Sequence, residues 1–231
     1  AEWKGWLNDK KFFTISEKEK THFTNQFNKI KIEYEGKDIL EYGYGAGDLL
    51  KFFHLNNCNI SGVEIQESLL KVAKKNKIKV YNSIDEIIED KFDIITAIDV
   101  LEHMTTNQIM SFFNSASKLL KHDGKMVFRF PNGESPASLP AQNGDFTHLN
   151  AIGKTKLTQL CEAFGFEVEY FDGEYVASIP FPLNIIIKFS RFLFRKLTGL
   201  GNSYFFYCNV IAVVKKIDLQ NRKKSFFRLN D

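Results

Sequence analysis

Cysteine is scarce in this chain, and its scarcity argues against several classes of protein. The three cysteines, Cys58, Cys161 and Cys208, lie far apart and form no C-x-x-C pair. An odd and scattered set of this kind indicates neither a disulfide framework nor a zinc site. We therefore expect reduced thiols, a cytoplasmic location and no bound metal.

Long apolar runs and a strong charge of either sign are also missing. No run of eighteen apolar residues occurs, so no membrane-spanning helix is expected. The mixed and charged segment 1–11 does not read as a signal peptide. A formal net charge of +3 is too small to indicate nucleic acid as the main partner. With 231 residues, 44% of them hydrophobic, the chain is large enough for one α/β domain with a substantial core.

The most informative stretch of the chain is Glu41-Tyr42-Gly43-Tyr44-Gly45-Ala46-Gly47, which follows a short apolar run. It predicts a strand that bends sharply into a helix. A dinucleotide fingerprint, G-x-G-x-x-G, would place its third glycine at position 48, where this chain has Asp48. A helix N-terminus normally attracts a pyrophosphate, but here the pyrophosphate would meet the carboxylate of Asp48. The bend suits a ligand that carries positive charge.

Apolar runs alternate with helical patterns from residue 37 onward. We predict strands at 38–42, 59–64, 78–81, 92–97, 124–130, 166–171 and 204–214, and helices near 47–55, 66–75, 85–89, 106–120 and 154–164. Near-continuous apolar strands such as 94–98 indicate a parallel sheet that is covered on both faces. The alternation predicts a doubly wound α/β fold that binds its ligands at the carboxyl ends of the strands.

Additional segments flank or interrupt this core. Ser16 and Glu19 form a capping box that begins a helix ending near Lys29. The chain is therefore interpreted as an N-terminal helical cap, a main domain with one insertion between its last two strands, and a basic tail: residues 1–36, 37–216 (insertion 172–203) and 217–231.

Residues 182–197, inside the insertion, predict a helix with a broad apolar face and a polar stripe of Asn184, Lys188, Arg191 and Arg195. Such a helix can pack against the sheet edge or a partner subunit. It can equally lie on an anionic membrane surface, because a basic stripe beside an apolar face is typical of interfacial helices. The sequence leaves both interpretations open, together with the choice between a monomer and a homodimer.

Two further motifs follow predicted strands. Glu64 closes the second strand, 23 residues after Glu41, and the run Phe92–His103 ends in D-V-L-E-H. Together with E-x-G-x-G-x-G and the turn Leu119–Lys125, these motifs resemble class I S-adenosylmethionine (SAM) methyltransferases over residues 38–132. The resemblance implies SAM as the methyl donor and S-adenosylhomocysteine (SAH) as the product. We predict a Rossmann-like, doubly wound and mostly parallel seven-stranded sheet of order 3-2-1-4-5-7-6, with helices on both faces.

The resemblance also implies which residues bind the cofactor. Glu64 would accept hydrogen bonds from the ribose diol, as an acid does at this place in dinucleotide folds. Asn82 and Ser83 stand where the family contacts adenine, and Asp99 would face the methionine part. The full set of expected cofactor residues is Glu41, Gly43, Tyr44, Gly45, Gly47, Glu64, Ile65, Asn82, Ser83, Ile84, Asp99 and His103.

The segments P-N-G-E-S-P, at 131–136, and G-D-F-T-H, at 144–148, resemble bacterial methyltransferases of surface-polysaccharide and glycan biosynthesis. This implies a sugar hydroxyl as acceptor, which gains from a positioned base. His148 is the expected base, and Asp145 either orients it or holds the acceptor. An alternative is that both residues only fasten the loop to the next helix.

Three more residues near the fifth strand are candidates for binding the acceptor: Arg129, Asn132 and Glu134. Arg129 lies within an apolar strand and needs a partner, either a protein carboxylate or an acceptor phosphate. An acceptor with a phosphoryl or phosphoramidate group therefore stays open. So does a protein that binds SAM without turnover.

Overall fold

The computed structural model describes residues 12–88, 91–175, 183–199 and 203–217. Its centre is a seven-stranded sheet of order β3-β2-β1-β4-β5-β7-β6, which confirms the predicted fold. The strands are β1 (Asp38–Tyr42), β2 (Asn59–Val63), β3 (Lys79–Tyr81), β4 (Phe92–Ile98), β5 (Leu120–Pro131), β6 (Phe166–Gly173) and β7 (Asn209–Lys216). The first five strands run parallel, and β7 pairs antiparallel with both β5 and β6.

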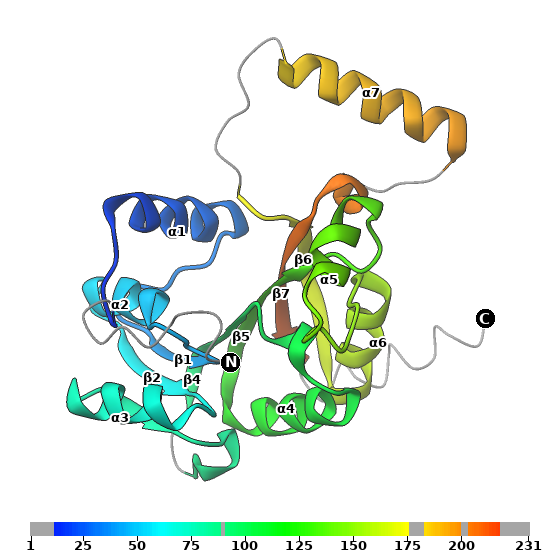
Figure 1. The fold of residues 1–231 in the computed structure, drawn as a ribbon. Coiled ribbons are helices and arrows are strands. Elements are labelled where there is room, and N and C mark those ends of the chain that lie inside the picture. The colour runs from blue at the N-terminus through cyan, green and yellow to red at the C-terminus, as the bar shows by residue number, and fades with distance from the viewer. Residues whose placement is uncertain (1–11, 89–90, 176–182, 200–202, 218–231) are drawn as a thin grey trace.

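The described part of the chain also contains seven α-helices (Figure 1). They are α1 (Glu17–Ile30), α2 (Asp48–Leu55), α3 (Glu67–Lys75), α4 (Thr106–Leu119), α5 (Leu139–Gly144), α6 (Lys154–Phe164) and α7 (Leu183–Thr198). Capping residues fix several of their ends. The predicted capping box of Ser16 and Glu19 begins α1, and Thr105 and Gln108 form a second box at α4. Gly165 ends α6 at a φ of 79°, a left-handed conformation that favours glycine.

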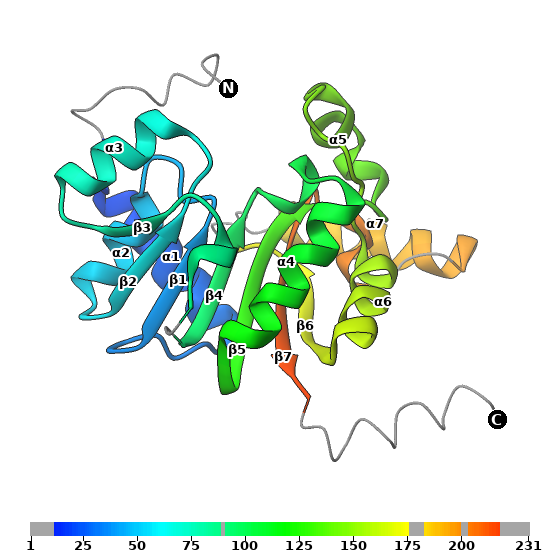
Figure 2. The ribbon, with the colours of Figure 1, turned by 90° about the horizontal axis from the view of Figure 1, so that it is seen from below.

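Successive strand residues point to opposite faces of the sheet, and each face is apolar. Ile39 and Ile94 pack with α1 and α2, whereas the next residues, Leu40 and Ile95, pack with α4 and α6. Figure 2 shows α4 and α6 lying along one face of the sheet. This double cover explains the near-continuous apolar runs of the central strands, because helices cover both of their faces. The carboxyl ends of β1, β2, β4 and β5 are left to form the site.

Some predicted boundaries were wrong. The predicted turn before the fifth strand belongs to β5, whose pairing with β4 shifts register between Phe92 and Ile94. The predicted helix 85–89 is a single 3₁₀ turn at Ile84–Glu86. The predicted last strand begins late, because residues Ser203–Phe206 form another 3₁₀ turn. The short helix α5 was not predicted, since Pro140 and Gly144 are typical of loops.

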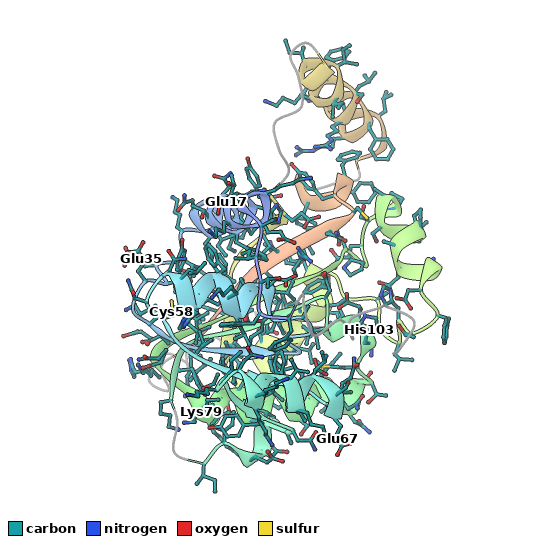
Figure 3. The ribbon with its side chains drawn as sticks, turned by 60° about the vertical axis from the view of Figure 1, so that its left-hand side comes forward. Glu17, Glu35, Cys58, Glu67, Lys79 and His103 are labelled. Atoms are coloured by element: carbon teal, nitrogen blue, oxygen red, sulfur yellow. The ribbon has the colours of Figure 1, made fainter. Side chains whose placement is uncertain are left out.

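The helix α7 lies apart from the sheet in Figures 1 and 3. Its apolar side chains are largely exposed, including Ile186, Phe189, Phe192 and Leu197. Near its end, the ring of Phe194 contacts the ring of Phe206, with centroids 5.4 Å apart. Packing of the whole helix against the sheet edge is therefore not observed. The two remaining interpretations, that α7 packs against a partner subunit or lies on an anionic membrane surface, stay predictions.

Within the described residues, no helix is both long and apolar enough to cross a bilayer. The cap, insertion and tail remain an interpretation of the chain's organisation. Residues 1–11 of the cap, 176–182 and 200–202 of the insertion, and 218–231 of the tail lie outside the described part of the structure.

Candidate active site

The glycine bend after β1 is the first element of the site. Gly43, Gly45 and Gly47 all have positive φ values, of 76°, 50° and 78°. A Cβ atom on Gly43 would lie 2.6 Å from a methyl carbon of Val100, so this position has no room for a side chain. A Cβ atom on Gly45 would meet nothing within 4 Å. The backbone at Gly45 therefore borders open space, where a ligand can approach the main chain closely.

Two buried carboxylates lie beside this bend. Glu64 is 6% exposed, and its Oε2 accepts a hydrogen bond from the Gly45 amide at 3.2 Å. Its Oε1 accepts from the amides of Ile65 and Gln66, at 2.8 and 3.1 Å. Glu41 is 4% exposed, and its Oε2 has no hydrogen-bond partner among the described residues. A buried and unpaired carboxyl oxygen is costly, so Glu41 is suited to meet a cationic or hydrogen-donating ligand.

The environment of Glu41 changes its protonation. Burial raises the pKa of Glu41 well above its ordinary value, and the charges of Asp48 and Glu64 raise it further. Between the pKa of the unfolded chain, ~4.3, and the higher pKa of the folded protein, Glu41 binds a proton in the folded protein only. The contribution of this proton to the free energy of unfolding is complete below the unfolded pKa. It is lost progressively as the pH rises toward the folded pKa.

Replacing Glu41 by glutamine should remove this loss. We expect Glu41→Gln to have a higher melting temperature than the native protein at neutral pH and a flatter profile as the pH rises above the unfolded pKa, measured without ligand. Glu67→Gln is the matched control, because the Glu67 side chain is 83% exposed on α3 (labelled in Figure 3). A Glu41→Gln profile that matches both the native protein and this control would contradict the inferred protonation.

Other expected cofactor residues fall into two groups. Ile65 is 80% exposed although it is apolar and follows Glu64 directly, so it is available to cover a flat ligand. The ring of Tyr44, in contrast, is buried against Gly62 and Leu50, which leaves its main chain as the part that can reach a ligand. Its position in the motif did not reveal this, because a bend residue can point to either side.

The loop after β3 is shaped by its own contacts. The Ser83 hydroxyl caps the 3₁₀ turn by accepting from the amide of Asp85, at 3.2 Å. The Asp85 carboxylate accepts from the Ser115 hydroxyl at 2.6 Å. Ile84 is buried and faces the core. The Asn82 amide donates to Glu86 at 3.1 Å. Adenine contact by Asn82, Ser83 and Ile84 stays a prediction.

Asp99 and Arg129 form an ion pair at the carboxyl end of β4. The Arg129 Nε donates to Asp99 Oδ1 at 2.9 Å, and a second hydrogen bond joins Nη2 to Oδ2. Glu174 lies 3.6 Å from Nη1. Arg129 thus has protein carboxylates as partners, the first of the two alternatives posed by the sequence. The predicted contact of Asp99 with the methionine part of the cofactor stays a prediction, and this carboxylate would make it while paired with Arg129.

Asn132 and Glu134 are used within the fold, which argues against their expected role in acceptor binding. Asn132 is fully buried; its Nδ2 donates to the Tyr204 carbonyl at 2.9 Å, and its Oδ1 accepts from the Glu134 amide at 3.1 Å. Glu134 Oε1 accepts from the Thr155 amide at 2.7 Å, inside the first turn of α6. Both residues hold β5 and the start of α6 in place. Their polar side chains suggested contact with a ligand, whereas in the structure their partners are backbone groups of the protein.

A histidine pair faces the loop that contains residues 145–148. The rings of His103 and His148 lie edge to face, with centroids 4.7 Å apart. Asp145 Oδ1 accepts from the Thr147 hydroxyl and amide, at 2.5 and 2.9 Å, and its Oδ2 lies 3.9 Å from His148 Nε2. Asp145 therefore both shapes the loop and lies near the imidazole. His103 lies against this loop (labelled in Figure 3), and its predicted contact with the cofactor stays a prediction.

Glu102 was not among the residues predicted for the site. It is 2% exposed, and it lies with both histidines in a group whose potential ligand atoms are all within 4.8 Å of one another. The signal was present in D-V-L-E-H, but residue order alone does not show that a loop some 45 residues later returns to it. The structure makes that connection, because the Leu149 and Asn150 amides both donate to the Glu102 carbonyl.

The residues around the bend fit an adenosine cofactor with a sulfonium group. The open backbone at Gly45, the unpaired oxygen of Glu41 and the exposed Ile65 each leave a place for a ligand. Glu64 would hold the ribose hydroxyls, and the unpaired oxygen of Glu41 would accept a hydrogen bond from the ligand. The fold and this site define a doubly wound enzyme whose cofactor site is built from carboxylates and bare backbone.

Comparison with known proteins identifies the family. A family model described as a methyltransferase domain matches residues 17–170, which is more than half of the chain. The chain belongs to this family, and it is a SAM-dependent methyltransferase. The cofactor predicted from the glycine bend is therefore confirmed.

Curated relatives and solved structures agree with this assignment. A ubiquinone biosynthesis O-methyltransferase of Coxiella burnetii is 27% identical over 168 residues, covering 61% of this chain and 71% of the relative. Its counterpart in Actinobacillus pleuropneumoniae is 32% identical over 107 residues, covering 40% and 45%. A SAM-dependent methyltransferase of Archaeoglobus fulgidus superposes with a TM-score of 0.66 at 19% identity, covering 85% of this chain and 94% of that one. At this identity the superposition supports the fold alone.

Proposed function

We propose that this enzyme methylates an oxygen of a sugar or glycan precursor in cell-surface polysaccharide synthesis. When bound, SAM supplies a methyl group on a sulfonium, which passes to a nucleophile by in-line displacement. The observation that supports an oxygen acceptor is the state of His148. Its Nδ1 lies 3.1 Å from the Gln142 carbonyl, which can only accept, so Nδ1 is the donor and Nε2 is the nitrogen that faces the reaction. Nε2 lies 3.9 Å from Asp145 Oδ2 and is placed to receive a hydroxyl proton.

The sugar part of the proposal is carried by the sequence resemblance at 131–148. A second candidate acceptor is favoured by the curated relatives, whose names specify O-methyl transfer in ubiquinone biosynthesis. In that case the acceptor is a hydroxyl on the ring of a quinone precursor. Both candidates need the same deprotonation, and they differ in the shape of the acceptor.

An acceptor with a phosphoryl or phosphoramidate group has less support. Arg129 was its expected anchor, and this guanidinium is committed to Asp99 and Glu174. An incoming phosphate would have to displace two carboxylates from a largely buried arginine. We therefore place a neutral hydroxyl compound ahead of an anionic one.

An acceptor panel tests the proposal. Nucleotide-linked sugars, free monosaccharides, catechol-type phenols and sugar phosphates are each incubated with SAM and the enzyme. SAH formation and a product heavier by one methylene group are followed by mass spectrometry. We expect turnover with a sugar and little with the sugar phosphates. Turnover confined to the phenols would overturn the glycan assignment in favour of the quinone precursor.

A further inference from the structure

The group of Glu102, His103 and His148 has the composition of a metal site. Two imidazoles and one carboxylate are the protein ligands of several catalytic zinc centres, which keep a position open for water or substrate. The three potential ligand atoms lie within 4.8 Å of one another, and Glu102 is buried. An ion with bonds of about 2.0–2.2 Å could be reached by all three after small side-chain movements.

The hydrogen bonds around the two histidines prepare both rings for coordination. The Thr147 hydroxyl donates to Asp145 Oδ1, so it accepts from His103 Nδ1, which lies 3.0 Å away. His148 Nδ1 donates to the Gln142 carbonyl at 3.1 Å. Each ring thus donates through Nδ1, so Nε2 is the nitrogen that would bind an ion. Metal-binding histidines are oriented in the same way, by a carbonyl or other acceptor on the opposite nitrogen.

The two segments that contribute these residues are joined firmly. The amides of Leu149 and Asn150 donate to the Glu102 carbonyl at 2.7 and 3.1 Å. The Asn150 side chain donates to the Met104 carbonyl at 2.6 Å. These bonds hold the loop with His148 against the 3₁₀ turn Leu101–His103. A site built from two segments that hydrogen bonds hold together is more rigid than one built on a free loop.

We propose that Glu102, His103 and His148 bind one divalent transition-metal ion of the zinc type, and that this ion also binds the acceptor oxygen. The binding site stands on the geometry alone, whereas its part in the reaction rests on the proposed function. This proposal departs from the prediction of no bound metal, which was based on the few and scattered cysteines. The fold brings together residues that are 45 positions apart along the chain.

The ion would change how the hydroxyl proton leaves. The O–H bond of the coordinated acceptor breaks, its electron pair stays on the oxygen, and the proton passes to the Asp145 carboxylate. As the new bond from this oxygen to the methyl carbon forms, the bond from carbon to sulfur breaks and its electron pair returns to sulfur. A bound cation favours the first step, because it stabilises the charge on the oxygen. Asp145 takes the place of the imidazole as the base.

The test begins with binding and needs neither SAM nor acceptor. Protein stripped with a chelator is titrated with Zn²⁺ by calorimetry and with Co²⁺ by visible absorption. We expect one ion per chain in the native protein and in His122→Ala, whose side chain is 76% exposed in the native structure. Glu102→Gln, His103→Ala and His148→Ala should each lose about tenfold or more in affinity. Equal affinity in all five proteins, or no binding in any, would overturn the site.

Stability and turnover complete the test. Zn²⁺ should raise the melting temperature of the native protein and of His122→Ala, and should raise that of Glu102→Gln by less at the same concentration. Glu102→Gln keeps the shape of the side chain, so it separates lost coordination from lost folding. With an acceptor found, chelation should stop turnover while SAH affinity stays the same. Turnover that survives chelation would overturn the ion's role in the reaction, although the protein would still be a methyltransferase. If the protein binds Zn²⁺ but no compound of the panel is methylated, only the proposed function is put in question.

Discussion

Replacing His148 by alanine is expected to lower kcat for methyl transfer by about 10²–10⁴-fold, which is the usual contribution of a positioned acid or base. The affinity for SAH should stay the same, because the imidazole lies on the loop of residues 145–148 and the cofactor residues lie at the glycine bend. The expectation holds whether His148 receives the proton or binds an ion that activates the acceptor. Single-turnover rates and calorimetry with SAH measure the two quantities separately.

The control for this variant is His122→Ala, which removes an exposed imidazole with the same chemistry. It should keep the native kcat. Thermal unfolding of both variants checks that the loop has not collapsed, since His148 also contacts the ring of His103. If His148→Ala transfers methyl groups at the native rate, then Asp145 and His148 only fasten the loop, which was the alternative left open by the sequence.

The sequence was sufficient for the fold because its signals were repeated. The strands β1, β2 and β4 are followed directly by Gly43, Glu64 and Asp99, and the alternation of strands and helices restricts the topology strongly. The alternation predicted the doubly wound fold correctly, and the resemblance of the motifs to methyltransferases predicted the sheet order and the cofactor correctly. Boundaries failed where hydrogen bonds decide the conformation locally, as at the 3₁₀ turn Ile84–Glu86, which is capped by Ser83.

The site is harder to predict than the fold, and one cause is common to several residues. Arg129, Asn132 and Glu134 were predicted to bind the acceptor because they are polar beside a strand end. In the structure each of them has a partner in the protein: Arg129 pairs with Asp99, Asn132 donates to the Tyr204 carbonyl, and Glu134 accepts from the first turn of α6. A sequence shows that a polar group needs a partner but not where that partner lies. The same limit hid Glu102, whose neighbours come from a distant loop.

The second large effect is expected for Glu64. In the structure both carboxylate oxygens accept backbone hydrogen bonds, from Gly45 on one side and from Ile65 and Gln66 on the other. The carboxylate therefore ties the bend after β1 to the end of β2 and keeps lone pairs for a ribose diol. Hydrogen bonds to a charged group contribute about 1.5–3 kcal/mol each. A Glu64 variant that no longer makes two such hydrogen bonds with the ribose should therefore bind SAH roughly 100-fold or more weakly.

Glu64→Gln is the sharper variant for this measurement, because it keeps the size of the side chain and replaces one acceptor oxygen by a donor amide. That amide would face either the Gly45 amide or the amides of Ile65 and Gln66, so a donor would meet a donor. We expect the bend to loosen and SAH affinity to fall, measured by calorimetry, while Glu67→Gln on exposed α3 keeps the native value. If Glu64→Gln binds SAH as tightly as this control, the carboxylate holds the bend without touching the cofactor, and the ribose must be bound by the backbone at Gly45.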